Sequence, residues 1–254
     1  MCLPDQAYAA FVRSPHAHAH VRAIDVAPAL AAADVVAVLT GEDYAADGLG
    51  ILPCGDRCTC RDGSPMEVPP HQALPVDRVR FVGEAIAMVI AGSESAAREA
   101  ADLVHVEYEP LEAITETAHA GDEGVPLVWE DCPANEAFLA SAGDADAFER
   151  VRETATYLVE QRLINHRVTA NTMEPRGAIG AYDTATSKFT LYAGVHSPHQ
   201  LRDILARDIF HLPADRFRVA TGDVGGSFGM RGAIYPELIL VLWAARHMGR
   251  PVKW

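Results

Sequence analysis

The stretch between residues 78 and 108 constrains the fold more than any other part of the chain. Polar and apolar side chains alternate over residues 78–82, and residues 85–90 are continuously apolar, which is typical of a half-buried and a buried strand. Ser93 can cap a helix with an alanine stripe, and the alternation returns over residues 104–108. This order of strand, strand, helix and strand predicts a domain of the α+β class.

The second half of the chain predicts further strands and three helices. The expected elements are strands at 154–169, 177–182, 188–194 and 217–220, a helix at 144–151, and helices that begin at Pro198 and Pro236. The strand at 154–169 is expected from a run of β-branched and long side chains. Because residues 252–254 begin another strand pattern as the chain stops, we expect the second half to expose an apolar sheet edge.

Charge and hydropathy argue against two classes of protein. The sequence has 21 basic and 35 acidic residues and a net charge of −14, which disfavours a nucleic-acid partner. The longest wholly apolar run, residues 238–245, is far shorter than the roughly 20 residues that a membrane-spanning helix needs. No secretory signal is visible, and the five cysteines are an odd number, so we expect reduced thiols and a cytoplasmic location.

A glycine-rich turn at residues 225–229, Gly-Gly-Ser-Phe-Gly, is the strongest candidate binding site. A predicted strand leads into it and a predicted helix follows. Glycines allow a positive φ and let a ligand approach the backbone, whose N–H groups favour an anion. The turn is not a P-loop, because Met230 and Arg231 follow it, and its glycine spacing differs from the dinucleotide fingerprint. A tight turn without a ligand is the common alternative.

His196 is the second candidate, because it lies between a predicted strand and Ser197, the expected cap of a helix. The positive end of a helix favours a neutral imidazole, which suits contact with an anion or an oxo group. A solvated loop histidine is the more common alternative for any single histidine.

Three histidines that alternate with alanine and three cysteines in one short loop are weaker candidates for a metal site. These residues are His16, His18, His20, Cys54, Cys58 and Cys60. On an extended strand the histidines would share one face, and imidazoles and thiolates are zinc ligands. The spacing matches neither a Cys-x-x-Cys motif nor a zinc finger, which favours a surface histidine run and reduced thiols.

Glu174 and Arg176 lie two residues apart between two predicted strands. A carboxylate and a guanidinium at this spacing could orient a substrate, or they could form a structural ion pair. We favour the ion pair. The sequence alone does not pair the partners of a Ser-His-Asp or Cys-His arrangement, so we infer no nucleophilic site.

Seven motifs follow one another in a fixed order along the chain. They are VRSPHAH at 12–18, VGEAIAMV at 82–89, VEYEPL at 106–111, MEPRGA at 173–178, SPH at 197–199, DVGGSFG at 223–229 and GRPVKW at 249–254. This order resembles the large, molybdenum-binding subunit of the xanthine dehydrogenase, aldehyde oxidase and carbon monoxide dehydrogenase family. The resemblance covers essentially the whole chain, and seven ordered motifs are much more specific than any single one.

The resemblance implies a division of the chain and a cofactor. Residues 1–115 resemble the α/β hammerhead domain, residues 116–125 form a polar linker, and residues 126–254 resemble the first, incomplete part of the molybdenum cofactor-binding domain. The implied cofactor is molybdenum–molybdopterin in its cytosine dinucleotide form. The family loop that lies against the pterin and the oxo ligands falls on Gly225, Gly226, Ser227, Phe228 and Gly229.

His196 occupies the position where relatives commonly have a glutamine whose amide contacts an oxo ligand. A neutral imidazole can donate one hydrogen bond and so can take over that role. In the family the catalytic glutamate lies far downstream of the region that this chain resembles. We therefore expect no catalytic residue and no metal ligand within the chain.

The resemblance also implies a reaction and partners. The family hydroxylates aldehydes, N-heterocycles or related small molecules and passes the electrons to iron–sulfur clusters and FAD. The expected partners are the remainder of the large subunit, an iron–sulfur small subunit and an FAD medium subunit. The family subunit is several-fold longer than this chain, so we expect a fragment, a truncated reading frame or half of a split subunit that is inactive alone.

Two other functions remain open from the sequence. The chain could be a noncatalytic module that docks partner subunits, or a small metal-binding protein that uses the three histidines and three cysteines named above. Metal analysis separates the three hypotheses, because they predict molybdenum with pterin, no metal, and zinc without pterin.

Overall fold

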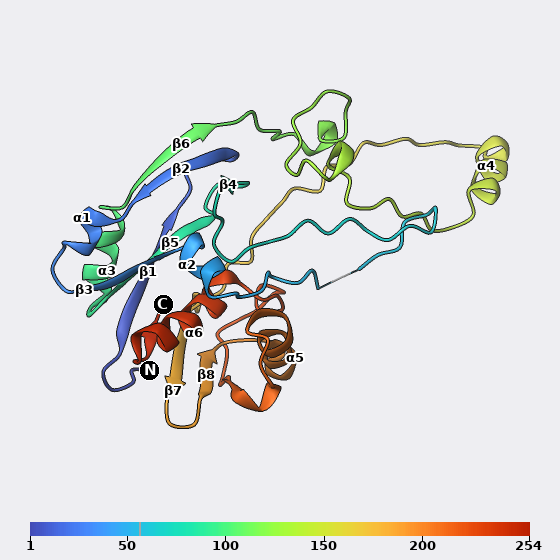
Figure 1. The fold of residues 1–254 in the computed structure, drawn as a ribbon. Coiled ribbons are helices and arrows are strands. Elements are labelled where there is room, and N and C mark those ends of the chain that lie inside the picture. Colours follow the sequence, from blue (N-terminus) through green and yellow to red (C-terminus); the bar gives the residue numbers. More distant parts are fainter. Residues whose placement is uncertain (56) are drawn as a thin grey trace.

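A computed structural model of the chain describes residues 1–55 and 57–254, which form two β-sheets with helices packed around them (Figure 1). The strands are β1 (Ala7–Arg13), β2 (Ala19–Asp25), β3 (Val35–Thr40), β4 (Arg78–Val79), β5 (Ala85–Ala91), β6 (His105–Pro110), β7 (Ala178–Asp183), β8 (Lys188–Ala193), β9 (Phe217–Ala220) and β10 (Val252–Lys253). The α-helices are α1 (Ala27–Leu30), α2 (Gly41–Ala46), α3 (Glu94–Ala101), α4 (Ala145–Thr154), α5 (Pro198–Ile204) and α6 (Pro236–Met248).

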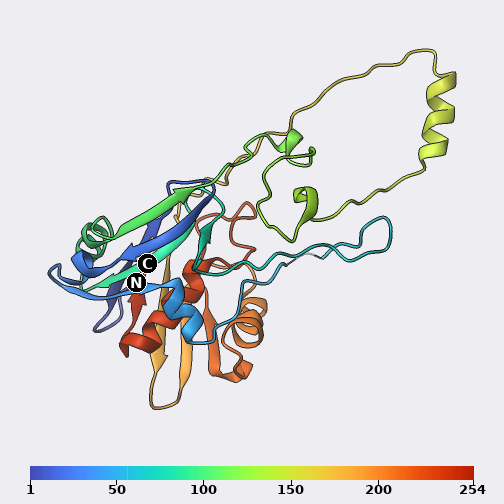
Figure 2. The ribbon, with the colours of Figure 1, turned by 45° about the horizontal axis from the view of Figure 1, so that its top comes forward.

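The larger sheet joins the two ends of the chain. Its strands follow the order β3-β5-β1-β10-β7-β8-β9. The last strand, β10, pairs in parallel with β1 and antiparallel with β7, and Val252 is fully buried there. Figures 1 and 2 accordingly show the two termini close together. Our expectation that the interrupted last strand leaves an apolar sheet edge exposed is therefore wrong, because β1 covers it.

The smaller sheet has the order β4-β2-β6 and packs on the first part of the larger one. Ala19 and Val79 from this sheet contact Ile86 of β5. Helix α3 packs its alanine stripe against β1 and β5, as predicted. Its N-cap is also as predicted, because the Ser93 hydroxyl accepts a hydrogen bond from the amide of Ala96 at 3.2 Å. The strand, strand, helix and strand pattern of residues 78–108 is confirmed, although β4 is only two residues long.

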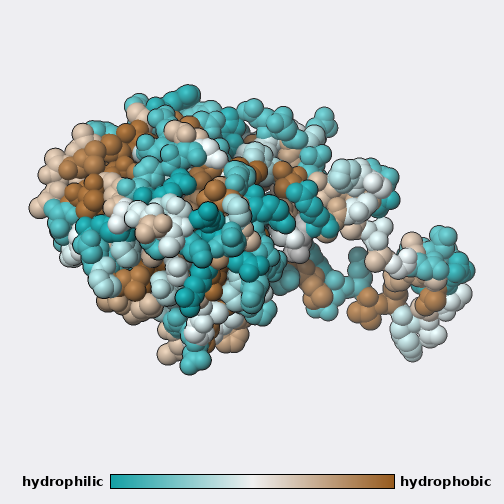
Figure 3. Space-filling model, turned by 60° about the horizontal axis from the view of Figure 1, so that its bottom comes forward, coloured by the Kyte–Doolittle hydropathy of each residue, from teal (hydrophilic) through white to brown (hydrophobic). Residues whose placement is uncertain are grey.

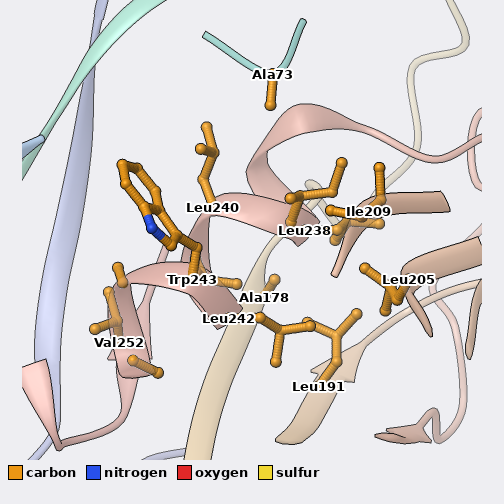
Figure 4. Packing of buried hydrophobic residues seen from close by; sticks show 14 of the residues in the cluster. Ala73, Ala178, Leu191, Leu205, Ile209, Leu238, Leu240, Leu242, Trp243 and Val252 are labelled. Atoms are coloured by element: carbon orange, nitrogen blue, oxygen red, sulfur yellow. The ribbon is translucent and has the colours of Figure 1, made fainter. Parts of the chain in front are cut away.

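Helix α6 forms the centre of the main core, and its residues from Glu237 to Ala245 are buried. Figure 4 shows its leucines and Trp243 packed among residues of β7, β8 and the segment after α5. The helix crosses β7 at Gly180, where an added Cβ would lie 2.2 Å from the carbonyl oxygen of Val241. Gly249 ends the helix with a φ of 62°, as its position after the last apolar residues predicts.

The strand expected at residues 154–169 is absent. Residues 145–154 form α4, and the chain after it is extended without pairing to any described strand, with residues 155–169 exposed. β-branched residues favour a strand only where a neighbouring strand and a packed face are available, and here neither is present. Residues 137–171 run out from the body to α4 and back, and we call this segment the arm (Figures 1 and 2).

Two further details differ from expectation. The strand expected over 78–82 ends at Val79, and Phe81 and Val82 are exposed. The helix that begins at Pro198 changes at Leu205–Ile209 into a π-helical turn. Among the described residues no helix is long and apolar enough to cross a membrane.

Candidate functional site

Two side chains hold the loop at residues 225–229 between β9 and α6. The Glu174 carboxylate accepts the Gly225 amide at 2.5 Å, and the Gly225 carbonyl accepts the Glu174 amide at 3.3 Å. The Arg231 guanidinium donates to the carbonyls of Gly226 at 2.9 Å, Glu174 at 2.8 Å and Gly194 at 3.2 Å. Because only 2% of the Arg231 side chain is exposed, a buried cation links the loop to the end of β8 and to the turn before β7.

The glycines of the loop are needed for different reasons. A Cβ on Gly225 would lie 2.5 Å from the Glu174 Cβ, so the packing of the chain itself excludes a side chain there. Gly226 and Gly229 have φ values of 109° and 89°, which other residues rarely adopt. At Gly229 nothing lies within 4 Å of an added Cβ, so this end of the loop borders open space.

The loop offers backbone donors that the described residues leave unused. The amides of Gly226, Ser227, Phe228 and Gly229 donate no hydrogen bond to residues 1–55 or 57–254. Consecutive free amides in a turn with positive φ favour an anion or an oxo group. This donor set therefore fits the negatively charged cofactor that the resemblance implies.

A hollow of about 480 Å³ lies next to the start of the loop, and residues 225–229 themselves are not part of its lining. It is lined by residues of the turn at 174–179, the end of β8, the segment after β9, and by Met1, Lys253 and Trp254. Glu174 belongs both to this lining and to the contacts that hold the loop, and the lining includes Asp223, two residues before Gly225. A hollow of this size is in the range of small-molecule sites.

His196 lies two residues before α5, as the sequence predicts. Its backbone amide donates to the Arg231 carbonyl at 3.0 Å, which brings residue 196 to the segment that follows the loop. The His196 side chain is exposed. Contact between this imidazole and a cofactor stays a prediction.

The ion pair that we favoured between Glu174 and Arg176 is wrong. Glu174 lies 3.4 Å from Arg231, whereas the Arg176 guanidinium stacks at 3.7 Å on the Tyr235 ring and lies 3.9 Å from Glu237. The Thr172 hydroxyl donates to the Glu174 carbonyl at 2.6 Å. This bend takes the segment out of strand geometry, so residues two apart do not share one face.

The histidines and cysteines do not assemble a metal site. His18 is buried, and its Nδ1–H donates a hydrogen bond to the Glu112 carbonyl at 3.0 Å. The centre of the His16 ring lies 4.8 Å from the centre of the Tyr108 ring. Of the three histidines, His20 alone lies within β2. Within the part of the chain that the structure describes, no group of three His, Cys, Asp or Glu residues is arranged to hold a metal ion.

Sequence reasoning missed two residues that shape this region. Arg231 was noted only because it rules out a P-loop, and a single arginine after a glycine turn carries no signal of burial. Glu237, which is 3% exposed, accepts from Arg13 at 2.7 Å. An acidic residue directly after Pro236 predicts a helix start, but does not reveal that two arginines converge on it.

Two family models match the chain. Residues 1–112 match the a/b hammerhead domain of aldehyde oxidase and xanthine dehydrogenase, and residues 128–254 match the molybdopterin cofactor-binding domain. The chain is 31% identical over 252 residues to subunit gamma of the 6-hydroxypseudooxynicotine dehydrogenase complex of Paenarthrobacter nicotinovorans. That match covers 99% of this chain and 31% of the relative.

Solved structures agree with this similarity. Quinoline 2-oxidoreductase from Pseudomonas putida 86 superimposes with a TM-score of 0.84 at 32% identity, covering 100% of this chain and 31% of that one. Carbon monoxide dehydrogenase from Oligotropha carboxidovorans superimposes with a TM-score of 0.89 at 26% identity, covering 100% of this chain and 32% of that one. The chain thus spans about a third of the length of the relatives that it matches.

Proposed function

The chain belongs to the family of molybdenum-binding large subunits that includes xanthine dehydrogenase, aldehyde oxidase and carbon monoxide dehydrogenase, and from this premise we propose that it forms one wall of a molybdopterin pocket. The enzyme that it contributes to hydroxylates aldehydes, N-heterocycles or related small molecules. Residues 1–254 match about a third of the relatives. In the family that they resemble the catalytic glutamate lies downstream of the matched region, so we expect these residues alone to be inactive.

The observation that carries this proposal is the set of unused amides at residues 226–229. Glu174 and Arg231 hold the loop that carries them, and the hollow of about 480 Å³, which is lined by Glu174 and Asp223, lies next to the start of that loop. A braced loop keeps its amides in place before a ligand arrives, so little ordering entropy is lost on binding. This combination is expected of a site for a large anionic group and is not required by a simple turn.

The residues of this chain position the cofactor and do not carry out the reaction. When bound, the cofactor supplies the two-electron oxidation by which water-derived oxygen enters a C–H bond. The amides of Gly226 to Gly229 balance negative charge on the cofactor, and His196 donates one hydrogen bond toward it. No described residue of the chain is assigned the role of general base.

Several finer features belong to the same proposal. The cofactor is the cytosine dinucleotide form of molybdopterin, and the protein is cytoplasmic. The partners are the remainder of the large subunit, an iron–sulfur subunit and an FAD subunit; the names of two relatives, a subunit gamma and a large chain, support membership of a complex. The hammerhead domain comprises residues 1–115, residues 116–125 are a linker, and the cofactor domain begins at residue 126.

The test compares two proline substitutions in the assembled enzyme purified through a tag on this chain. Ser227→Pro removes one of the unused amides of the loop, while Ser141→Pro alters an exposed loop of the arm that contacts no part of the hollow. We expect the unsubstituted protein and Ser141→Pro to contain molybdenum and pterin. Ser227→Pro should lose at least half of both.

Equal molybdenum and pterin contents in the two variants would contradict the role of the loop. Zinc without pterin in the unsubstituted protein would contradict the proposal as a whole, as would an aldehyde or purine oxidised by residues 1–254 alone with a dye acceptor. The alternative of a small metal-binding protein has no geometric support among the described residues.

A further inference from the structure

The returning half of the arm, residues 155–169, exposes large apolar side chains that contact little of the chain. Their exposed fractions range from 63% to 88%. The residues are Tyr157, Leu158, Val159, Leu163, Ile164 and Val168. Figure 3 shows hydrophobic surface along the thin projection that Figure 1 identifies as the arm. Contiguous exposed apolar surface of this kind marks an interaction site.

The backbone of the same segment is also without partners. From residue 156 to residue 173, no amide donates a hydrogen bond to the described part of the chain, and pairing resumes only at Glu174 with Gly225. An extended backbone with unused donors and acceptors on both sides is a template for pairing with another strand. The segment therefore lacks both of the contacts that stabilise a strand, a neighbour in a sheet and a packed face.

The order of the side chains shows what kind of neighbour would suit it. In strand geometry Tyr157, Val159 and Leu163 face one side, while Leu158, Ile164 and Val168 face the other. Polar side chains lie between them on each face, among them Arg162 on one and Arg167 on the other, so the segment suits a strand that is covered on both faces at its apolar positions. A strand at the surface would instead alternate apolar and polar residues.

We propose that residues 155–169 become a strand by pairing with a strand edge in the part of the large subunit that relatives have and this chain does not match. This inference rests on the proposed function, and it assigns the segment of this chain that binds the remainder of the large subunit. The relatives are about three times as long as the match, so the family supplies a large body of protein for this role.

A second copy of this chain fits the segment less well. Two arms paired with each other would form a two-stranded ribbon, which is marginally stable in water and leaves apolar side chains on at least one face exposed. Two packed layers are needed to cover both faces, and the arm projects away from the body of its own chain (Figure 2). The remainder of a large subunit can provide both layers.

The test measures hydrogen exchange of the large subunit purified from its native host through a tag on Met1, whether the subunit is one polypeptide or two. Residues 1–254 produced alone are the reference. We expect amides of residues 156–169 to exchange at least about 100-fold more slowly in the assembled subunit than in the reference. Molybdenum and pterin are measured in the same samples, so that failure of the cofactor proposal is seen separately.

Two adjacent proline substitutions and a matched control identify the interaction. Alternate amides of a strand face opposite neighbours, so either Val159→Pro or Glu160→Pro must remove a donor that faces the partner. At least one of them should reduce recovery of assembled subunit tenfold. Phe148→Asp, on α4 at the tip of the arm and 63% exposed, should leave recovery unchanged.

Each of the following outcomes would overturn the inference. If the assembled subunit contains molybdenum and pterin while residues 156–169 still exchange rapidly, the segment is not a paired strand. If the chain is recovered without further large-subunit sequence, or if protection arises in a dimer of residues 1–254, the assigned partner is wrong. If Phe148→Asp alone prevents assembly, the interaction surface is α4 and not the extended segment.

Discussion

Trp243 of α6 donates its indole N–H to the carboxylate of Asp47 at 2.7 Å, across a sequence separation of 196 residues. His247 Nε2 lies 2.5 Å and Arg246 3.4 Å from the same carboxylate oxygen. Asp47 is the C-cap of α2, and the Tyr44 ring of that helix packs edge-on against Trp243. One carboxylate therefore fastens α2, in the hammerhead match, to α6, in the cofactor-domain match.

Asp47→Asn should make the free energy of unfolding depend less on pH in the acid range. Burial raises the pKa of the Asp47 carboxyl, but hydrogen bonds from Trp243 and His247 and the charges of His247 and Arg246 outweigh it, so the pKa lies below its ordinary value. A lowered pKa in the folded state gives stability that is full above the ordinary carboxylate value and is lost as pH falls through the folded value.

At pH 7 we expect Asp47→Asn to reduce the free energy of unfolding by about 1–2 kcal/mol, and the difference from wild type to shrink as the pH falls below the ordinary carboxylate value of about 4. Urea unfolding followed by tryptophan fluorescence measures this. Asp102→Asn, at the end of α3, serves as the control. A difference that stays constant down to pH 2 would show that the Asp47 charge is not responsible.

Arg231→Met should loosen the candidate site. The substitution keeps much of the buried volume but removes the donors to the carbonyls of Gly226, Gly194 and Glu174. We expect a loss of about 2–3 kcal/mol in the free energy of unfolding and faster hydrogen exchange at Gly225. Arg22→Met, at an exposed ion pair with Glu109, should change stability by less than about 0.5 kcal/mol. Equal effects of the two substitutions would argue against Arg231 as the brace of the loop.

Gly225→Ala adds a methyl group at a closely packed position, and Gly222→Ala adds one in open space in the same region. A Cβ at residue 225 would meet Glu174 at 2.5 Å, whereas at residue 222 nothing lies within 4 Å. Gly225→Ala should lower the free energy of unfolding by about 1–3 kcal/mol, and Gly222→Ala should change it by less than about 0.5 kcal/mol. Chemical denaturation measures the free energy of unfolding of both variants. A Gly225→Ala protein as stable as the wild type would mean that Glu174 does not contact the loop as described.

Gly180→Ala should weaken the packing of α6 on β7. The added methyl would lie 2.2 Å from the Val241 carbonyl oxygen and 2.6 Å from the Leu242 amide nitrogen, so backbone atoms of α6 would have to shift. We expect a loss of about 3 kcal/mol or failure to fold. Gly121→Ala, where the nearest atom is at 3.5 Å, is the matched control. Thermal unfolding measures both, and a Gly180→Ala protein as stable as the control would place α6 elsewhere.

Local patterns predicted those elements whose signals lie within a few residues. The Ser93 cap and the alanine stripe predicted α3, Pro236 and Gly249 predicted both ends of α6, and residues 217–220 predicted β9. Helix α2 was missed, although Thr40 and Asp43 form a capping box that the sequence displays. The strand expected at 154–169 was wrong because strand propensity depends on a neighbour that the described chain does not supply.

By itself the sequence determined the periodicity of the helices and buried strands and the order of the seven motifs, and the family follows from that order. These are local properties, since they depend on side chains a few positions apart. The tertiary structure alone decided that β10 lies between β1 and β7, that Glu174 contacts Gly225 and Arg231 in preference to Arg176, and that Asp47 meets Trp243. Hydrogen bonds and ion pairs act over about 3 Å, so their partners are chosen by how distant segments pack, which spacing along the chain does not specify.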